Sequence, residues 1–591
     1  MPDDGRPAVA GDVWGEATQP DDGSPGAELV LAHPAGQVTA APTGLQVPDA
    51  VAATLATLGA DTVFGVVGSG NFKVTNALIR RGARYVAARH EGGAAVMADA
   101  WARMTGRPGI LSVHQGPGLT NAVTGITEAA KSRTPLVVLA ADVAAAAVRS
   151  NFRIDVAALA RSVGATAFRL RSPSFAVDET VRAYRTAVAE RRTVVLALPL
   201  DVQAGACTVP PIGAVTAPPA VTPSAAATGS LAEALARARR PVFIAGRGAR
   251  VARARPDLER LADRCGALLA TSAAAKGLFR GSPWDLDVSG GFASPLAAEL
   301  ISGADLVVGW GCSLNMWTLR HGKLIGPDTT VAQVDDDRAA IGAHRRAALG
   351  VTGDVALTAR AVADALGPVT GDVGYRSDAL RARIAAEVRW RDVPYEDESD
   401  GKRIDPRTLT IGLDDILPAE RIVAVDSGNF MGYPSMFLSV PDDDGFCMTQ
   451  AYQSVGLGLA SAIGSAIARP DRLTVAALGD GGALMGISEL ETVVRLGLPM
   501  VIVIYDDQAY GAEVHHFGPD GDPLDTVEFP PVKLARIARG FGCYGVTVRR
   551  QRDLRAVREW LDGPRDKPLV VAAKVTSSHG AWWLEEAFRG H

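Results

Sequence analysis

The chain has 591 residues, a length that predicts roughly three to four domains, and its hydrophobic fraction of 47% supports large buried cores. The formal net charge of −5 excludes the basic surface typical of nucleic-acid-binding proteins. No apolar run reaches the roughly 18–20 residues that span a membrane, the N-terminal segment does not resemble a signal peptide, and the five cysteines lack metal-type spacing. We therefore expect a cytoplasmic protein with reduced thiols that binds neither nucleic acid nor membrane.

The N-terminal part of the chain divides into an extension and a first domain. Residues 1–46 are rich in Pro, Gly, Asp and Ala without sustained periodicity, which predicts a flexible extension. From 47 to 208, short Val, Ile and Leu runs alternate with helical patterns. This alternation predicts an α/β domain with buried parallel strands.

Polar residues follow three apolar runs of this first domain. The segments are Ser69-Gly70-Asn71, Arg89-His90-Glu91 and His114-Gln115. Glu91 opens a helix, so one interpretation is a carboxylate that only interacts with the helix dipole. For His114 the corresponding alternative is a histidine that packs a loop at the end of a strand.

A linker and a second α/β domain follow. Residues 209–229 are rich in Pro and Ala, which predicts a linker, and residues 230–370 again alternate strand and helix signals. Gly246-Arg247-Gly248 follows a strand, but Val251 stands where a dinucleotide-binding glycine pattern needs its third glycine. A charged, helical connector is predicted for residues 371–404.

The third predicted domain, residues 405–591, contains two acidic strand ends. The apolar run 473–478 leads into Gly479-Asp480-Gly481, an amphipathic helix follows, and the next apolar run ends in Asp506-Asp507. In a parallel sheet both carboxyl ends face one crevice, so Asp480 and Asp507 can reach one hard cation, while the glycines let backbone N–H groups approach a phosphate. The alternative is a tight turn after a strand, because such tripeptides are common in α/β proteins.

The segment from Gly479 to Gly511 resembles the thiamine-diphosphate-binding motif of acetolactate-synthase-like enzymes. The resemblance implies that Asp480, Asp507 and the main-chain carbonyl of Ala509 hold Mg²⁺ against the cofactor diphosphate. Asp occupies both pair positions, 506 and 507, where Asn is common in the family. The added negative charge beside an anionic diphosphate predicts a stricter Mg²⁺ requirement.

The segment around Glu91 is similar to the cofactor-activating glutamate signature of the same superfamily. The resemblance implies that Glu91 hydrogen-bonds the pyrimidine ring of thiamine diphosphate, a role for which a carboxyl with a raised pKa is suited. It also implies three doubly wound parallel-sheet α/β domains, which are pyrimidine-binding, central and diphosphate-binding. In the family the first and third domains meet across a subunit interface, so we expect a homodimer or homotetramer with active sites at that interface.

Further positions match cofactor-contacting residues of the family. The resemblance places the diphosphate turn at Gly428-Asn429 and the aminopyrimidine-binding turn at 453–456, where Val455 would bend the cofactor. Phe430 cannot donate the hydrogen bond that a His supplies in acetolactate synthases. The full set of expected cofactor contacts is Glu91, Gly428, Asn429, Gln453, Val455, Gly479, Asp480, Gly481, Gly482 and Asp507.

Ser69 and His114 resemble the active-site Ser and His of benzoylformate decarboxylase. The resemblance implies that Ser69 holds a substrate carboxylate and that His114 shuttles protons, and it favours decarboxylation of a 2-oxo acid. Additional candidates for the substrate pocket are Gly70, Asn71, Gln115, Asn151, Arg153, Glu513 and His516. For Glu513 and His516 the alternative to a pocket role is solvent exposure, and for Arg153 it is an ion pair with Asp155.

The sequence therefore predicts a thiamine-diphosphate- and Mg²⁺-dependent decarboxylase or carboligase that acts on a small 2-oxo acid through a C2 ylide and an enamine intermediate. Acetolactate synthesis and benzaldehyde-lyase-like cleavage remain alternatives within the family. From other classes, a nicotinamide-dependent oxidoreductase and a non-catalytic cofactor-binding protein remain open. FAD is not expected, because the Arg-Phe-Asp-Asp-Arg stretch common in acetolactate synthases is replaced at 312–317.

Overall fold

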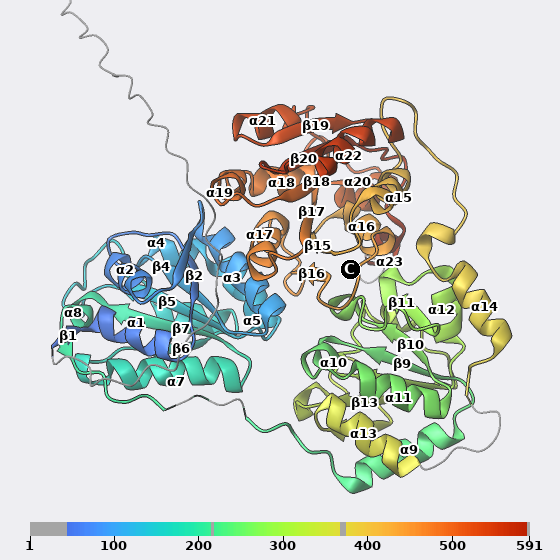
Figure 1. The fold of residues 1–591 in the computed structure, drawn as a ribbon, viewed down its shortest axis with the longest axis horizontal. Coiled ribbons are helices and arrows are strands. Elements are labelled where there is room, and N and C mark those ends of the chain that lie inside the picture. Colours follow the sequence, from blue (N-terminus) through green and yellow to red (C-terminus); the bar gives the residue numbers. More distant parts are fainter. Residues whose placement is uncertain (1–43, 214, 216–217, 367–373, 588–591) are drawn as a thin grey trace, which may run out of the picture. The chain divides into compact units, whose positions relative to one another are not determined.

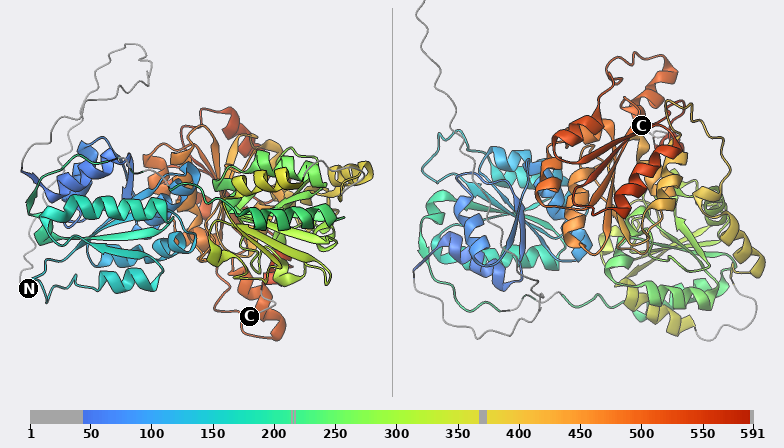
Figure 2. Two further views of the ribbon diagram at one scale, coloured as in Figure 1. Left: turned by 90° about the horizontal axis from the view of Figure 1, so that it is seen from below. Right: turned by 45° about the horizontal axis from the view of Figure 1, so that its top comes forward.

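A computed structural model describes residues 44–213, 215, 218–366 and 374–587. The flexible extension predicted for residues 1–46 lies outside the described residues except for its last three. Two of these, β1 (Leu45–Gln46), pair antiparallel with β8 (Ala206–Cys207), so the first domain includes them. The described part of the chain forms three six-stranded parallel sheets flanked by helices (Figure 1, Figure 2), which confirms the predicted fold class.

The first sheet has the strand order β3-β2-β4-β5-β7-β6. Its strands are β2 (Thr62–Gly65), β3 (Arg84–Ala87), β4 (Gly109–Val113), β5 (Leu136–Asp142), β6 (Thr166–Arg169) and β7 (Thr193–Pro199). Its helices are α1 (Val47–Thr57), α2 (Phe72–Arg80), α3 (Glu91–Thr105), α4 (Pro117–Asn121), α5 (Val123–Lys131), α6 (Val156–Ser162), α7 (Ala176–Ala189) and α8 (Leu200–Gln203). Strands β4, β5 and β7 are buried over their whole length, as their continuous apolar runs predict.

The second sheet has a different order, β11-β10-β9-β12-β13-β14. Its strands are β9 (Pro241–Ala245), β10 (Leu268–Thr271), β11 (Asp285–Val288), β12 (Leu306–Trp310), β13 (Thr330–Asp335) and β14 (Leu349–Thr352). Its helices are α9 (Ala225–Arg237), α10 (Arg247–Val251), α11 (Arg255–Cys265), α12 (Pro295–Ser302) and α13 (Val355–Leu366). In the predicted connector, the described residues form α14 (Asp378–Glu387).

The third sheet has the order β16-β15-β17-β18-β20-β19, which repeats the connectivity of the first sheet. Its strands are β15 (Arg421–Val425), β16 (Phe446–Met448), β17 (Leu473–Gly479), β18 (Met500–Asp506), β19 (Tyr544–Val548) and β20 (Leu569–Lys574). Its helices are α15 (Pro406–Ile416), α16 (Gly432–Phe437), α17 (Gly458–Ala468), α18 (Asp480–Met485), α19 (Glu489–Arg495), α20 (Gly511–Phe517), α21 (Leu534–Gly540), α22 (Arg555–Asp562) and α23 (Trp582–Ala587).

Helix α3 of the first domain packs directly on α17 of the third domain. A Cβ atom added to Gly464 would lie 2.3 Å from the carbonyl oxygen of Met97, so this close approach requires a glycine. Residues of both helices belong to one hydrophobic cluster that continues into both sheets. Within the described ranges, no helix combines the length and the apolar character needed to cross a membrane.

Candidate active site

The predicted cofactor residues lie where the strand order of the third sheet reverses. After β15 the chain adds β16 on one side of it and then returns to add β17 on the other. The carboxyl ends of β15 and β17 lead into Gly428-Asn429 and Asp480, respectively. Ligands of doubly wound sheets bind at such a reversal, outside the carboxyl ends of the strands.

Asp480 and Asp507 are two half-buried carboxylates at neighbouring strand ends. The Asp480 carboxylate accepts a hydrogen bond from Gln508 N at 3.1 Å, and Asp507 accepts one from Ala509 N at 3.3 Å. Burial, reinforced by the charge of Asp506, raises the pKa of Asp480 to about 6. Burial and the charge of Asp480 raise the pKa of Asp507 to about 7. Two half-buried carboxylates that destabilise each other's charge form a site suited to a divalent cation.

In the described part of the chain, no cluster of three His, Cys, Asp or Glu side chains could hold a metal ion. The expected ligand set contains only two carboxylates, because its third member is the carbonyl of Ala509. The donors are all oxygens, as Mg²⁺ prefers.

The third acidic residue of this region, Asp506, forms an ion pair away from Asp480 and Asp507. Its carboxylate forms an ion pair with Lys574 at the end of β20, and the two side chains are 2% and 11% exposed. The positive charge of Lys574 offsets the negative charge of Asp506. Asp506 is one of the two carboxylates that the sequence predicts beside the diphosphate. The charge of Asp506 nevertheless helps to raise the pKa of both Asp480 and Asp507, so both pair positions contribute to the predicted Mg²⁺ requirement.

The ion pair yields a stability prediction. We expect Asp506→Asn or Lys574→Met alone to lower the stability of the third domain by about 3–5 kcal/mol, because each leaves a buried charge without its partner. The double variant Asp506→Asn/Lys574→Met should recover most of the loss, since it removes both charges. Scanning calorimetry of the four proteins measures the effect, and equal melting temperatures for the wild type and both single variants would contradict it.

The diphosphate turn is linked to the C-terminal segment. Gly428 has a φ of 138°, a conformation that side chains rarely adopt. Asn429 accepts hydrogen bonds from Ala581 N through its side chain and from Trp583 Nε1 through its carbonyl, both at 2.9 Å. Phe430 is buried and stacks on Tyr505, with ring centroids 5.3 Å apart. Phe430 thus supports the turn by packing.

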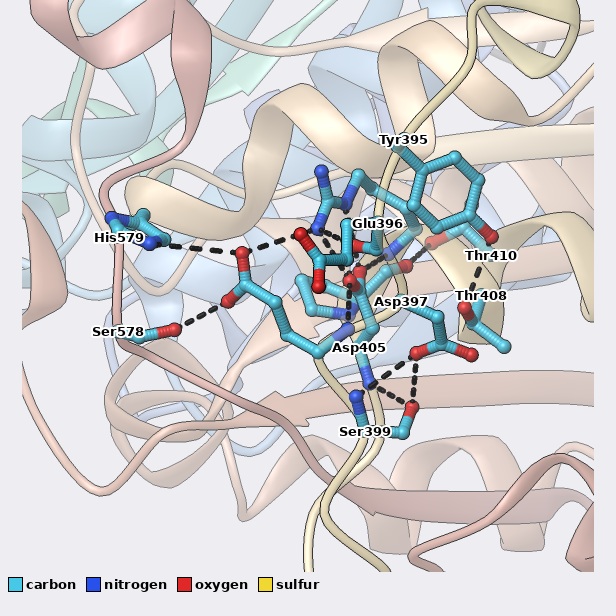
Figure 3. Close-up of polar contacts among 12 residues, drawn as sticks. Tyr395, Glu396, Asp397, Ser399, Asp405, Thr408, Thr410, Ser578 and His579 are labelled. Atoms are coloured by element: carbon cyan, nitrogen blue, oxygen red, sulfur yellow. Dashed lines mark hydrogen bonds and ion pairs between the residues drawn. The ribbon is translucent and has the colours of Figure 1, made fainter.

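The residues just before the C-terminal helix α23 also contact the segment that precedes the third domain. Glu398 accepts a hydrogen bond from Ser578, and its carboxylate lies 3.7 Å from His579 Nε2. Figure 3 shows Ser578 and His579 beside the segment that contains Tyr395, Asp397 and Asp405. The C-terminal segment is therefore anchored both at Glu398 and at the diphosphate turn.

The loop 449–457 is shaped by a buried carboxylate that the sequence analysis did not select. Asp426 has no exposed surface and accepts hydrogen bonds from Ser427 N at 2.9 Å and from Gly456 N and Leu457 N at 3.1 Å. Burial raises its pKa to about 6 despite these donors. Gln453 has a φ of 59°, and Val455 is 36% exposed.

Glu91 and His114 lie close together in the first domain. Glu91 is the first residue of α3, and its Oε2 accepts a hydrogen bond from Asn121 Nδ2 at 3.1 Å. A Cβ atom on Gly118 would lie 3.0 Å from His114 Cβ and 3.6 Å from Glu91 Oε1. His114 Nδ1 accepts from Gly70 N at 3.1 Å, which leaves the proton of the neutral ring on Nε2.

The remaining candidates of the first domain differ in their surroundings. Ser69 is exposed, whereas Asn71 is buried, accepts from Gly68 N, and donates to Val66 O and to Ser112 Oγ. Asn71 therefore organises the loop that carries Ser69 and Gly70. Gln115 is buried against Gly70, and its Oε1 has no hydrogen-bond partner.

The weaker pocket candidates are placed as follows. Asn151 and Arg153 are exposed, and Asp155, the suggested partner of Arg153, caps α6 by accepting from Ala158 N at 2.9 Å. Glu513 and His516 lie on α20, and the ring of His516 is 4.5 Å from that of Phe517.

A cleft of about 1800 Å³ is lined by every third-domain candidate except His516. Its lining includes Gly428, Asn429, Gln453, Val455, Gly479, Asp480, Gly481, Gly482, Asp507, Ala509 and Glu513. Glu91 and His114 are not among the described residues that line it.

Three family models match the chain. They describe thiamine pyrophosphate enzymes: the N-terminal TPP binding domain at residues 45–159, the central domain at 229–362, and the C-terminal TPP binding domain at 426–573. The chain is 30% identical over 517 residues to a probable 2-ketoarginine decarboxylase of Pseudomonas aeruginosa, covering 85% of this chain and 88% of that protein. The chain belongs to the thiamine pyrophosphate enzyme family.

Other relatives of this thiamine pyrophosphate enzyme carry different names. A sulfoacetaldehyde acetyltransferase of Rhodobacter capsulatus is 28% identical over 558 residues, covering 90% of this chain and 94% of that protein. The large subunit of acetolactate synthase isozyme 2 of Escherichia coli is 27% identical over 540 residues, covering 89% of this chain and 95% of that protein. These relatives identify the family and leave the substrate open.

The glycines of the central domain have a packing explanation in this thiamine pyrophosphate enzyme. A Cβ atom on Gly246 would lie 2.3 Å from Gly311 O, and one on Gly248 would lie 2.7 Å from Gly311 Cα. Both glycines thus permit two loops to touch. The incomplete glycine pattern is the only support for a nicotinamide cofactor, and the close contact with Gly311 gives both glycines a packing role.

Proposed function

We propose that this thiamine pyrophosphate enzyme is a Mg²⁺-dependent decarboxylase or carboligase of a 2-oxo acid. The observation that supports it most directly is the placement of His114 beside Glu91, on either side of Gly118. A proton-transferring imidazole next to the cofactor-activating carboxyl suits a reaction that releases CO₂ and then protonates the remaining fragment. The names of the decarboxylase, acetyltransferase and synthase relatives agree with this reaction class.

Each candidate residue has a defined task in the proposal. Bound thiamine diphosphate supplies a carbon nucleophile and an electron sink. Asp480, Asp507 and the Ala509 carbonyl would hold the cation, and Gly428-Asn429 would receive the diphosphate. In the substrate half, the exposed hydroxyl of Ser69 would bind the substrate carboxylate.

Two residues would manage protons. Glu91 would hold a proton on the carboxyl oxygen that Asn121 leaves free. His114 would move a proton at Nε2, because Nδ1 is occupied by the N–H of Gly70.

The active site of the proposed enzyme is assembled from two chains. This assembly is supported by the absence of Glu91 and His114 from the described residues that line the cleft of Asp480 and Asp507. A second copy of the chain would bring its Glu91 to this cleft, so we propose a homodimer or a homotetramer built from such dimers.

The proposed activity is tested with a substrate panel. Purified protein with thiamine diphosphate and Mg²⁺ is given aliphatic, aromatic and guanidino 2-oxo acids, with and without an acceptor aldehyde, and CO₂ and carbon–carbon bond formation are followed. We expect CO₂ release from at least one acid and its loss with a chelator. Absence of CO₂ and of any ligation product across the panel would refute the proposal.

The position of His114 predicts a pH profile. Burial lowers the pKa of His114 below its ordinary value of 6.5, so the ring is neutral at pH 7 and the acid limb that it controls lies below pH 6.5. His114→Gln should lower kcat for decarboxylation by about 10²- to 10⁴-fold and abolish this limb while cofactor affinity is retained. A variant with an unchanged pH profile and turnover would show that His114 only packs its loop.

A further inference from the structure

The cofactor-facing loop of the third domain is held at its start by a carboxylate of the first domain. Glu128, on α5, has a fully buried side chain, and each of its oxygens accepts one backbone hydrogen bond from this loop. Ala451 N donates to Oε1 at 3.1 Å and Tyr452 N donates to Oε2 at 2.7 Å. These residues immediately precede Gln453, so the contact fixes the entry to the predicted aminopyrimidine-binding turn.

Arg103 makes this buried carboxylate stable in its charged form. Its Nη2 lies 2.7 Å from Glu128 Oε1, and its Nη1 donates to Met448 O at 2.8 Å, at the end of β16. Burial acts to raise the pKa of Glu128, but the Arg103 charge and the two backbone N–H groups outweigh it and lower the pKa. Arg103 itself is balanced by Asp99, one turn earlier on α3.

A second carboxylate, which belongs to the third domain, accepts backbone hydrogen bonds from the first domain. Glu489, at the start of α19, is 2% exposed, and its Oε1 accepts from Arg89 N and from His90 N, both at 3.0 Å. Its Oε2 accepts from Thr492 Oγ1 at 2.6 Å. The next residue after His90 is Glu91, so Glu489 fixes the turn from which the activating carboxyl projects.

The sequence makes room for this second contact. A Cβ atom on Gly93 would lie 2.6 Å from Glu489 Oε1, so a side chain at this position would displace the carboxylate. Gly93 lies inside α3, where alanine has the higher helix propensity. A glycine at this helical position is thus explained by the approach of Glu489.

We propose that Glu128 and Glu489 are reciprocal positioning residues: each domain orders, through buried carboxylate-to-backbone hydrogen bonds, the segment of the other that contacts the cofactor. Glu128 orders the loop 449–457, and Glu489 orders the turn 88–92. The inference rests on the proposed function for the roles of Glu91, Gln453 and Val455. The two contacts themselves are independent of it.

The different hydrogen-bond patterns of the two carboxylates predict different responses to glutamine. Glu128 uses both oxygens to accept backbone N–H groups. In Glu128→Gln the side-chain NH₂ group replaces one of these oxygens and faces a backbone N–H, so two donors meet and that hydrogen bond is lost. Glu489 uses one oxygen for both N–H groups and the other for a hydroxyl, which can accept as well as donate. Glu489→Gln should therefore retain the contact, whereas Glu489→Ala and Gly93→Ala should lose it.

Hydrogen–deuterium exchange of the full-length chain without added cofactor tests the contacts directly. We expect Glu128→Gln to accelerate exchange within 449–457, and Glu489→Ala and Gly93→Ala to accelerate exchange within 88–92. Glu489→Gln and the control Glu491→Gln should resemble the wild type. Glu491 is a suitable control because it also lies on α19 and also binds Arg89, but through an exposed side-chain pair.

Binding and turnover provide the second readout. With Mg²⁺ present, Glu128→Gln should bind thiamine diphosphate about 10- to 100-fold more weakly, because the loop must be ordered on binding. Glu489→Ala should lower kcat about tenfold or more with little change in KM. Unchanged exchange in the named segments, or an equal acceleration in all three domains, would overturn the proposal. Failure of the wild type to bind thiamine diphosphate would instead refute the proposed function.

Discussion

Glu91→Gln is expected to lower turnover of the accepted 2-oxo acid by about 10²- to 10⁴-fold while the protein still binds thiamine diphosphate. Asn121 donates to Glu91 Oε2, which leaves Oε1, the oxygen nearest to Gly118, for the cofactor ring. Glutamine keeps the shape and the hydrogen-bonding capacity of the side chain, but it cannot gain or lose a proton at neutral pH. The loss should therefore fall on kcat and leave the dissociation constant of the cofactor nearly unchanged.

The measurement is steady-state CO₂ release together with calorimetric titration of the cofactor. Glu190→Gln is a matched control, because Glu190 lies in the same domain in an exposed pair with Arg192. It should behave like the wild type. Turnover of Glu91→Gln within about threefold of the wild type would contradict the assigned role.

Asp480→Ala is expected to abolish Mg²⁺-dependent binding of thiamine diphosphate, with a loss of affinity of at least about 100-fold. The substitution removes one of two anionic ligands from a cation that binds oxygen donors, and it leaves the N–H of Gln508 without its partner. Asp507 alone would carry the charge, with weaker attraction for the metal. Affinity should fall at every Mg²⁺ concentration that the titration covers.

The control for this variant is Asp471→Ala. Asp471 lies just before the opposite end of the same strand, β17, and forms an exposed ion pair with Arg469. Titration of cofactor in the presence and absence of Mg²⁺ should separate the two variants. Equal affinity of Asp480→Ala and the wild type would show that the cation is held elsewhere.

The fold and the strand-end positions of the predicted cofactor residues were largely predictable from local sequence. Continuous apolar runs identified buried parallel strands, and acidic or glycine residues directly after them identified the strand ends that face one crevice. Asp480 and Asp507 were found in this way, because each is fixed by the strand that precedes it. Glu91 was selected by the resemblance of its segment to the cofactor-activating glutamate signature of the family.

Long-range partners were not predictable in the same way. Glu489 contacts residues about 400 positions away, and Glu128 contacts a loop more than 320 positions away, so no local periodicity marks them. Lys574 ends an apolar strand and gave no signal that it pairs with Asp506. Asp426 was visible as an acid after a strand, and that signal could have selected it.

The type of a loop residue also does not reveal whether it contacts a ligand or supports its own loop. Asn71 was grouped with substrate-pocket candidates because of its position beside Ser69, but its amide is hydrogen-bonded within its own loop and to Ser112. Gly246 suggested a nucleotide because of its spacing, but a neighbouring loop fills the space beside it. In both cases the role of the residue depends on a contact with the end of another strand, which local sequence does not reveal.

The most direct test of the central claim is the exchange rate of the C2 proton of bound thiamine diphosphate with deuterium, measured by quenched-flow NMR with Mg²⁺ present. The wild type should exchange this proton far faster than the free cofactor does. Glu91→Gln, with cofactor equally bound, should fall back towards the free rate. Equal exchange rates in the wild type and Glu91→Gln would contradict the assignment of Glu91 as the residue that activates the cofactor.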